Sequence, residues 1–178
     1  MPFRSVVLCE DETDLLLFPP LRAAWSLRGE QAPVPISGRN AKRVIFGSLS
    51  LRSGSRLLLE QRNHRGDNFQ AFLELVHWHY RGWKVAMLLD ADSSHTAQAS
   101  RDLADDLGIE LLWLPNRSPH LNPMDHLWRH GKENICANWQ YPSIDAQVEA
   151  FFLYLYGLTP HEALHKAGVL SGDFWLNL

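Results

Sequence analysis

The stretch WKVAMLLD, residues 83–90, decides the fold, because it is a continuous apolar run that ends in an acid. An amphipathic segment follows at 96–108, and a second apolar run, IELLWLP, comes next at 109–115. Two apolar strands separated by a helix indicate a parallel pair that is covered on both faces. The sequence therefore predicts a mixed α/β domain.

The rest of the chain supplies further elements of this domain. We expect a buried strand at 5–12, a hairpin of strands at 43–50 and 56–63, and helices at 67–80, 123–138 and 143–168. Residues 18–40 hold four prolines and two glycines, and they predict a long irregular loop of the kind that is functional or disordered. Because no linker or repeat interrupts the pattern, we expect residues 1–178 to form a single domain.

The composition is that of a globular protein: 46% of the 178 residues are hydrophobic and 21% are charged. No apolar run approaches the roughly 18–20 residues of a membrane span, and the N-terminus does not resemble a signal peptide. The two cysteines show no CxxC spacing, which argues against a disulfide framework and a thiolate zinc site. We therefore expect a cytoplasmic protein without membrane association.

The charge is unevenly distributed. The net charge is −3, yet the segment 21–66 holds nine Lys and Arg against two Glu and carries +7 by itself. Two interpretations stay open at this point. The segment forms either a basic surface on an otherwise acidic protein or a strip that faces phosphates.

Three aspartates stand at the ends of elements. Asp11 and Asp90 close two buried strands, and parallel strands deliver their carboxyl ends to the same edge of a sheet. Asp125 falls in the first turn of a helix that Asn122 caps and Pro123 begins, so it also has a purely local interpretation, as a helix-dipole partner paired with Arg129.

Clustered carboxylates repel one another, and a divalent cation removes that penalty. Carboxylate oxygens suit Mg²⁺ or Mn²⁺, and a pair of such ions supports phosphoryl transfer. The three aspartates are therefore candidate ligands of a two-ion site.

At these residues the chain resembles the DDE transposases, specifically the mariner-related group of insertion-sequence transposases. The resemblance lies in LCEDETD and WSLRGEQ near the N-terminus, in MLLDADSSH at 87–95 and in LPNRSPHLNPMDHLW at 114–128. The 34 residues between Asp90 and Asp125 match the interval in mariner-type enzymes whose third acid is Asp. One departure is Ala91, where the family has Asn.

The resemblance implies a ribonuclease-H-like fold, with a mixed five-stranded sheet and helices on both faces. It implies a transposase catalytic domain that cleaves DNA at transposon ends and transfers the freed strand into a target. Asp11, Asp90 and Asp125 would be the catalytic residues and would hold two Mg²⁺ or Mn²⁺ ions. Four more residues are candidates for contacting DNA: His95, Arg117, His120 and Lys132.

The resemblance also bears on partners. Such enzymes carry helix-turn-helix modules ahead of the catalytic domain, and here Met1 sits directly before the first strand. We therefore expect a separate DNA-binding chain or an excised catalytic domain. The loop at 18–40 occupies the place of a family loop that reaches a partner subunit, which implies a homodimer or a DNA contact. The non-enzymatic alternative is a decayed or domesticated domain that binds DNA or assists assembly.

A rival motif is HEALH at 161–165, which fits the zinc-protease pattern H-E-x-x-H. However, Thr159 and Glu162 also form a capping box with Pro160 at the first helical position, so the Glu has a structural role. The 13 residues that follow the motif contain no His or Glu to act as a third zinc ligand. A metalloprotease is therefore the weaker alternative.

Overall fold

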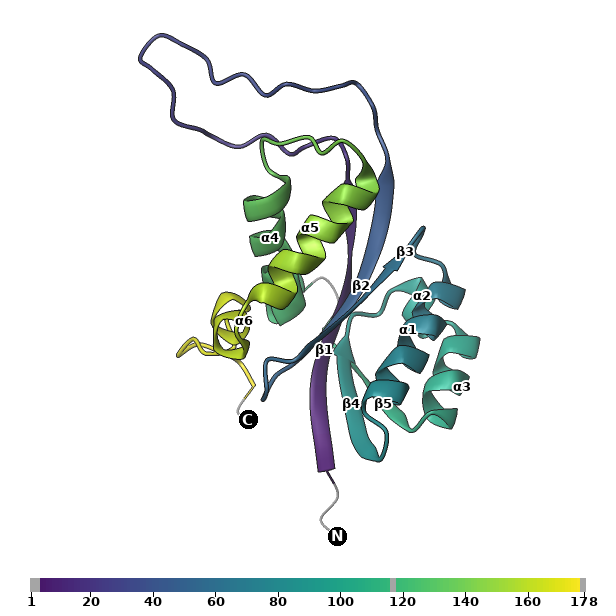
Figure 1. Cartoon of the computed structure of the whole chain (residues 1–178). Helices are drawn as coiled ribbons and strands as arrows, with labels where there is room; N and C mark the ends of the chain where they lie inside the picture. Colours follow the sequence, from purple (N-terminus) through teal and green to yellow (C-terminus); the bar gives the residue numbers. More distant parts are fainter. Residues whose placement is uncertain (1–3, 116–117, 177–178) are drawn as a thin grey trace.

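The computed structural model describes residues 4–115 and 118–176, and its centre is a five-stranded sheet (Figure 1). The strands lie in the order β3-β2-β1-β4-β5. Their bounds are Arg4–Leu16 for β1, Lys42–Ser50 for β2, Arg56–Gln61 for β3, Trp83–Leu89 for β4 and Ile109–Trp113 for β5. The mixed five-stranded sheet expected from the sequence is confirmed.

The pairing of the strands agrees with the sequence pattern. β2 and β3 form the expected antiparallel hairpin, and β4 and β5 form the expected parallel pair. β1 is central, antiparallel to β2 and parallel to β4 with Cys9 opposite Leu88. Extending this parallel register by two residues places Asp11 beside Asp90. The expectation that Asp11 closes its strand is wrong, because β1 continues to Leu16.

Helices cover both faces of the sheet (Figure 1). On one side lie α1 (Gly66–His79), α2 (Ser93–Thr96) and α3 (Gln98–Asp106), and on the other lie α4 (Pro123–Gly131), α5 (Ile144–Gly157) and α6 (Pro160–Lys166). Each layer encloses its own apolar core. Phe46, Phe69 and Phe72 centre the core under α1, whereas Trp128 and Phe151 centre the core under α4 and α5.

Three expected helices differ in extent from the observed ones. The α-helical part of the helix expected at 123–138 ends at Gly131, and the chain continues as a π-helical stretch, Lys132–Cys136. A short 3-10 turn, Pro119–Leu121, precedes this helix. The helical region expected at 143–168 is two helices, because Pro160 begins α6 after the extended Leu158 and Thr159. The helix expected at 96–108 is preceded by the separate turn of α2.

Residues 17–41 contain no helix or strand, as the proline content predicted. Figure 1 shows this segment as a long loop that projects from the body of the domain. Its base is fastened by Asn138, whose backbone N–H donates to Pro20 O at 3.0 Å and whose side chain bonds the backbone of Arg22. Farther along the loop, the Gln140 side chain donates to Arg39 O at 2.9 Å. Between these anchors Trp25 is fully exposed.

Within the described ranges, 4–115 and 118–176, none of the helices has the length and apolar content needed to cross a lipid bilayer.

Candidate active site

The three aspartates singled out in the sequence line one cavity of about 230 Å³. Asp11 comes from β1, Asp90 directly follows β4, and Asp125 lies in the first turn of α4. The other lining residues are Glu12, Leu114, Pro115, Ser118 and Asn122. Elements far apart in the chain thus bring three carboxylates to the carboxyl edge of the β1–β4 pair.

Asn122 fixes the start of α4 against the sheet. Its side-chain oxygen accepts the backbone N–H of Met124 at 3.0 Å, which confirms the expected cap. Its buried amide nitrogen donates to Glu10 O on β1 at 2.7 Å. One side chain therefore caps the helix and ties the helix to the strand that carries Asp11. Asp125 also forms the expected local pair with Arg129, at 2.9 Å, on the exposed side of the helix.

Asp11 experiences the repulsion expected from a cluster of acids. Burial, together with the charges of Glu12, Asp125 and Asp90, raises the pKa of Asp11 to about 8. The charged form of this carboxylate is thus disfavoured in the protein alone. A bound divalent cation would supply the missing positive charge, so the donor set fits a hard cation.

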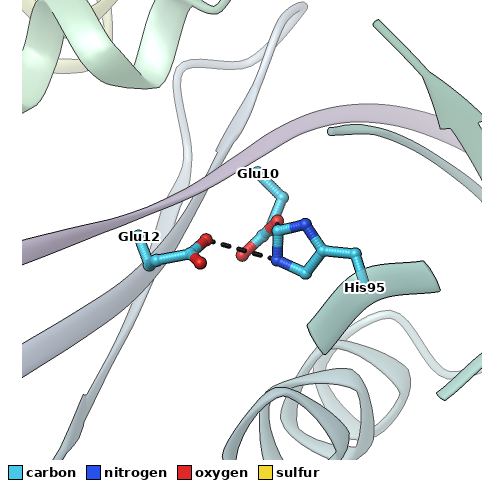
Figure 2. A group of neighbouring side chains, drawn as sticks. All are labelled: Glu10, Glu12 and His95. Carbon is cyan, nitrogen blue, oxygen red and sulfur yellow. Dashed lines mark ion pairs between the residues drawn. The ribbon is translucent and has the colours of Figure 1, made fainter. Parts of the chain in front are cut away.

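His95 lies in the interior of the protein, and only 1% of its side chain is exposed. Its Nε2 atom is 3.2 Å from Oε2 of Glu12 and 3.6 Å from Oε2 of Glu10 (Figure 2). The expected contact between His95 and a DNA phosphate is therefore wrong, because the ring is not accessible to a backbone phosphate. The sequence did not single out Glu10 and Glu12, whose side chains lie on the face of β1 opposite Asp11.

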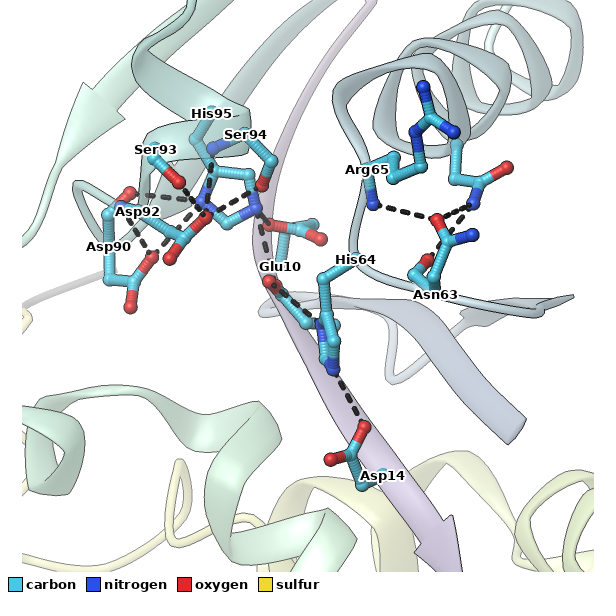
Figure 3. A network of polar contacts seen from close by, with 12 residues as sticks. Glu10, Asp14, Asn63, His64, Arg65, Asp90, Asp92, Ser93, Ser94 and His95 are labelled. Carbon is cyan, nitrogen blue, oxygen red and sulfur yellow. Dashed lines mark hydrogen bonds and ion pairs between the residues drawn. The ribbon is translucent and has the colours of Figure 1, made fainter. Parts of the chain in front are cut away.

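The other nitrogen of His95 holds Asp90 (Figure 3). Nδ1 lies 3.0 Å from Oδ1 of Asp90, which also accepts the backbone N–H of Asp92 at 3.1 Å. The hydrogen bond from His95 is the main reason that the pKa of Asp90 is below its usual value. Two donors thus orient Asp90 although Ala91 replaces the asparagine of the family pattern.

A second histidine continues the network along β1. His64 Nε2 contacts Oδ1 of Asp14 at 2.6 Å, and its Nδ1 lies 3.6 Å from Glu12 (Figure 3). Lys42 also binds Asp14, at 2.7 Å. Glu10, Glu12 and Asp14 on this face of β1 therefore each lie within 4 Å of a basic side chain. Among the described residues, no such ion pair includes Asp11 on the other face.

Comparison with known families decides the identity of this site. Residues 6–146, which include all three aspartates, match the model of the DDE superfamily endonucleases. The chain belongs to this family.

One curated protein is similar to the chain in sequence. The uncharacterised 39 kDa protein of insertion element IS630 from Shigella sonnei is 27% identical over 140 residues, which cover 78% of this chain and 41% of that protein. The chain thus spans less than half the length of this curated relative.

Two solved structures have the same fold. The Mos1 mariner paired-end complex with Mn has a TM-score of 0.72 at 18% identity, covering 92% of this chain and 52% of that one. The catalytic domain of Mos1 mariner transposase has a TM-score of 0.64 at 18% identity, covering 92% of this chain and 76% of that one. The ribonuclease-H-like fold expected from the sequence is confirmed.

Neither His120 nor Lys132 lines the cavity of the three aspartates. His120 is exposed on the 3-10 turn before α4, and Arg117 falls outside the described residues. Lys132 lines a neighbouring cavity of about 420 Å³ with Phe18 and Pro19. Burial lowers the pKa of Lys132, while the charges of Asp14, Asp125 and Asp11 oppose that effect.

The basic segment 21–66 divides into two groups. Five of its nine cations bind acids or carbonyls of the domain itself: Arg22, Lys42, Arg43, Arg56 and Arg65. The other four are exposed: Arg28, Arg39, Arg52 and Arg62. About half of the cations of this segment are thus engaged within the domain, four arginines are exposed, and both interpretations of the segment stay open.

The HEALH motif has a structural role in this endonuclease fold. Thr159 and Glu162 form the expected capping box at the start of α6. The Glu162 carboxylate accepts both the backbone N–H and the hydroxyl of Thr159, at 2.8 and 2.7 Å. Within the part of the chain that the structure describes, His161 and His165 belong to no group of three clustered metal ligands. This arrangement disfavours the protease alternative.

Proposed function

We propose that this chain is the catalytic domain of a transposase, which cleaves DNA strands and transfers a 3′-hydroxyl end into a target. The observation that carries the proposal is the cavity that Asp11, Asp90 and Asp125 line together. Asp11 cannot easily keep its charge there without a cation, because burial and its acidic neighbours raise its pKa. The family assignment supports the same chemistry.

The three aspartates would hold two Mg²⁺ or Mn²⁺ ions. Two such ions about 3.5–4 Å apart activate an attacking oxygen and stabilise the leaving oxygen of a phosphodiester when bound. The attacking group is water in cleavage and the DNA 3′-hydroxyl in strand transfer, so no protein nucleophile is required. Mos1 mariner paired-end complexes have been solved with Mn and with Mg, which supports this choice of ion.

The protein's own contribution is the placement of the carboxylates. Asp11 is fixed by the central strand, and Asp90 is oriented by His95 and the backbone N–H of Asp92. Asp125 is placed by the Asn122 bridge between α4 and β1. Each ligand therefore has a support of its own, which keeps the site organised before DNA binds.

DNA is the proposed partner, with the loop 17–41 as a second contact region. Arg28 and Arg39 on this loop are exposed and available to phosphates. The loop also exposes Trp25, Leu21 and Leu27, which suits an apolar contact with a second copy of the chain. We propose a homodimer on DNA, with recognition of transposon ends supplied by another segment or chain.

The test is nicking of supercoiled plasmid with Mn²⁺. We expect nicking by the wild-type chain and none by Asp11→Ala, Asp90→Ala or Asp125→Ala, with circular dichroism showing intact folds. Asp106→Ala, which removes an exposed acid from α3, is the matched control and keeps wild-type nicking. Undiminished nicking by any of the three site variants refutes the assignment. A wild-type chain that binds DNA without nicking it favours the inert, domesticated alternative.

A further inference from the structure

A second group of possible metal ligands lies on the other face of β1. Glu10 and Glu12 alternate with Asp11 along the strand, so their side chains lie on the other face of the strand, toward His95 on α2. Figure 2 shows the two carboxylates converging on the imidazole. Among the described residues, this is the one group of three His, Cys, Asp or Glu whose ligand atoms all lie within 4.8 Å of one another.

Glu10 is the unusual member of the group. Its side chain is completely buried, and neither carboxylate oxygen accepts a hydrogen bond from the residues that the structure describes. Burial raises its pKa well above the usual value, although His95 opposes that rise. A buried carboxylate without hydrogen bonds is strongly destabilising, so this position calls for a positive partner.

The hydrogen bonding of His95 leaves one nitrogen for that partner. Nδ1 faces two acceptors, the backbone and side-chain oxygens of Asp90, at 3.2 and 3.0 Å, so this nitrogen carries the donated proton. Nε2 is buried and makes no aligned hydrogen bond to a described residue, although it faces the two glutamates. A histidine that donates one N–H to a carboxylate and turns the other nitrogen inward has the arrangement of a metal-ligating histidine.

The distances suit a small cation. Ligands of a tetrahedral Zn²⁺ ion lie roughly 3.3 Å from one another, because each bond of ~2.0–2.1 Å meets the next near the tetrahedral angle. Nε2 lies 3.2 Å from Glu12 and 3.6 Å from Glu10, on either side of that value. One neutral imidazole and two carboxylates would also balance the charge of a divalent ion.

We propose that Glu10, Glu12 and His95 bind one divalent transition-metal ion of the Zn²⁺ class, at a site separate from the aspartate cavity. Of the three residues, Glu12 also lines that cavity. The ion would lock the ring of His95, and through its Nδ1 the orientation of Asp90. It is therefore a structural site, which acts on the aspartate cavity only by orienting Asp90.

The experiment is a zinc titration of the chelator-treated full chain without DNA, by calorimetry. We expect about one Zn²⁺ per chain, bound about tenfold or more weaker in Glu10→Gln and Glu12→Gln, since each variant loses one of three protein ligands. Asp106→Asn is the matched control, because Asp106 is an exposed acid on α3 that belongs to neither proposed site, and it should leave zinc affinity unchanged.

Two results would overturn the site. One is a wild-type chain that binds no zinc, which makes His95 a protonated partner of the glutamates. The other is zinc affinity that is equal in the wild type and Glu10→Gln, or that falls as far in Asp106→Asn. If Glu10→Gln does not fold, the visible spectrum of the Co²⁺-loaded wild type decides, with intense tetrahedral bands expected and weak octahedral bands contradicting the site. No nicking is measured, so failure here leaves the proposed function untouched.

Discussion

Nδ1 of the buried His95 lies 3.0 Å from Oδ1 of Asp90, so an interior ring orients a carboxylate whose side chain is 62% exposed. Side chains that orient a metal ligand affect ion binding without touching the ion. This relationship replaces the phosphate contact expected for His95. It also makes the histidine a positioning residue for the proposed ion site.

We predict that His95→Ala raises the Mn²⁺ concentration needed for half-maximal nicking by about 10–100-fold, the usual effect of losing such a partner. His95→Asn, whose amide can donate from near the place of Nδ1, should retain more of the activity. Manganese titration of plasmid nicking measures both, with thermal melts to compare their folds. Equal manganese requirements in the wild type and His95→Ala would contradict the role.

A glycine in β2 controls how closely α4 approaches the sheet. Gly47 is paired with Asp11, and a Cβ there would lie 2.5 Å from the Trp128 ring and 2.9 Å from the end of Met124. We predict that Gly47→Ala costs about 1–3 kcal/mol of stability by overpacking and reduces nicking, because α4 carries Asp125. Urea unfolding and the nicking assay measure the two effects.

The control for this prediction is Gly157→Ala at the end of α5, where an added Cβ meets no atom within 4 Å. It should leave nicking unchanged. If Gly47→Ala matches this control in both stability and nicking, close packing of α4 on β2 does not set the position of Asp125.

The raised pKa of Asp11 predicts a pH-dependent stability in the metal-free protein. An unfolded Asp titrates near ~3.9, whereas folded Asp11 titrates at about 8. Between these values the folded state holds the extra proton, so stability should fall as the pH rises from about 4 to 8. Each lost kcal/mol lowers the Tm by about 2–4 °C in a chain of this size.

Thermal melts of chelator-treated wild type and Asp11→Asn between pH 5 and 9 test this prediction. The amide cannot ionise, so the Tm of the wild type should decline relative to the variant as the pH rises. Added Mg²⁺ should restore the wild type most at the alkaline end. Parallel Tm curves for the two proteins would show that Asp11 is not in a repulsive site.

The projecting loop makes a separate prediction about partners. Deleting residues 22–38 removes Arg28 and Trp25 between the anchors that Asn138 and Gln140 provide. We expect weaker DNA binding with a smaller salt dependence, because fewer phosphate contacts release fewer counterions, and reduced self-association. Binding isotherms at several salt concentrations and sedimentation measure these changes.

Two point variants separate the apolar effect from the charge effect. Trp25→Ser should reduce self-association, while Trp78→Ser, which changes an exposed tryptophan on α1, should not. An unchanged salt-dependent isotherm after the deletion would rule the loop out as a DNA contact.

Much of the fold followed from sequence because its apolar runs are unambiguous. The strand at 83–90 and the next at 109–115 imply a parallel pair. The register of β1 on β4 explains why Asp11 and Asp90 line one cavity. The capping box with Pro160 at the first helical position predicts a helix start that conflicts with one helical region at 143–168, and the structure has that start. The extension of β1 to Leu16 was missed, because acids on both faces hide the alternation that marks a strand.

The buried residues on the other face of β1, Glu10 and His95, were not predictable from sequence in the same way. Glu10 sits within a run of acids and was not distinguished from solvated neighbours, yet it is completely buried. Its burial arises from His95, a residue far along the chain that packs onto it only in the folded domain. The available signal was the spacing of Glu10, Glu12 and Asp14, which places three acids on one face of a strand.

Anomalous diffraction from crystals of the full chain soaked in Mn²⁺ tests the central claim most directly. The account predicts manganese peaks in the cavity, within bonding distance of carboxylate oxygens of Asp11, Asp90 and Asp125, and their loss in Asp90→Asn crystals. Peaks confined to other acids of the surface, or a cavity empty at saturating manganese, would contradict it.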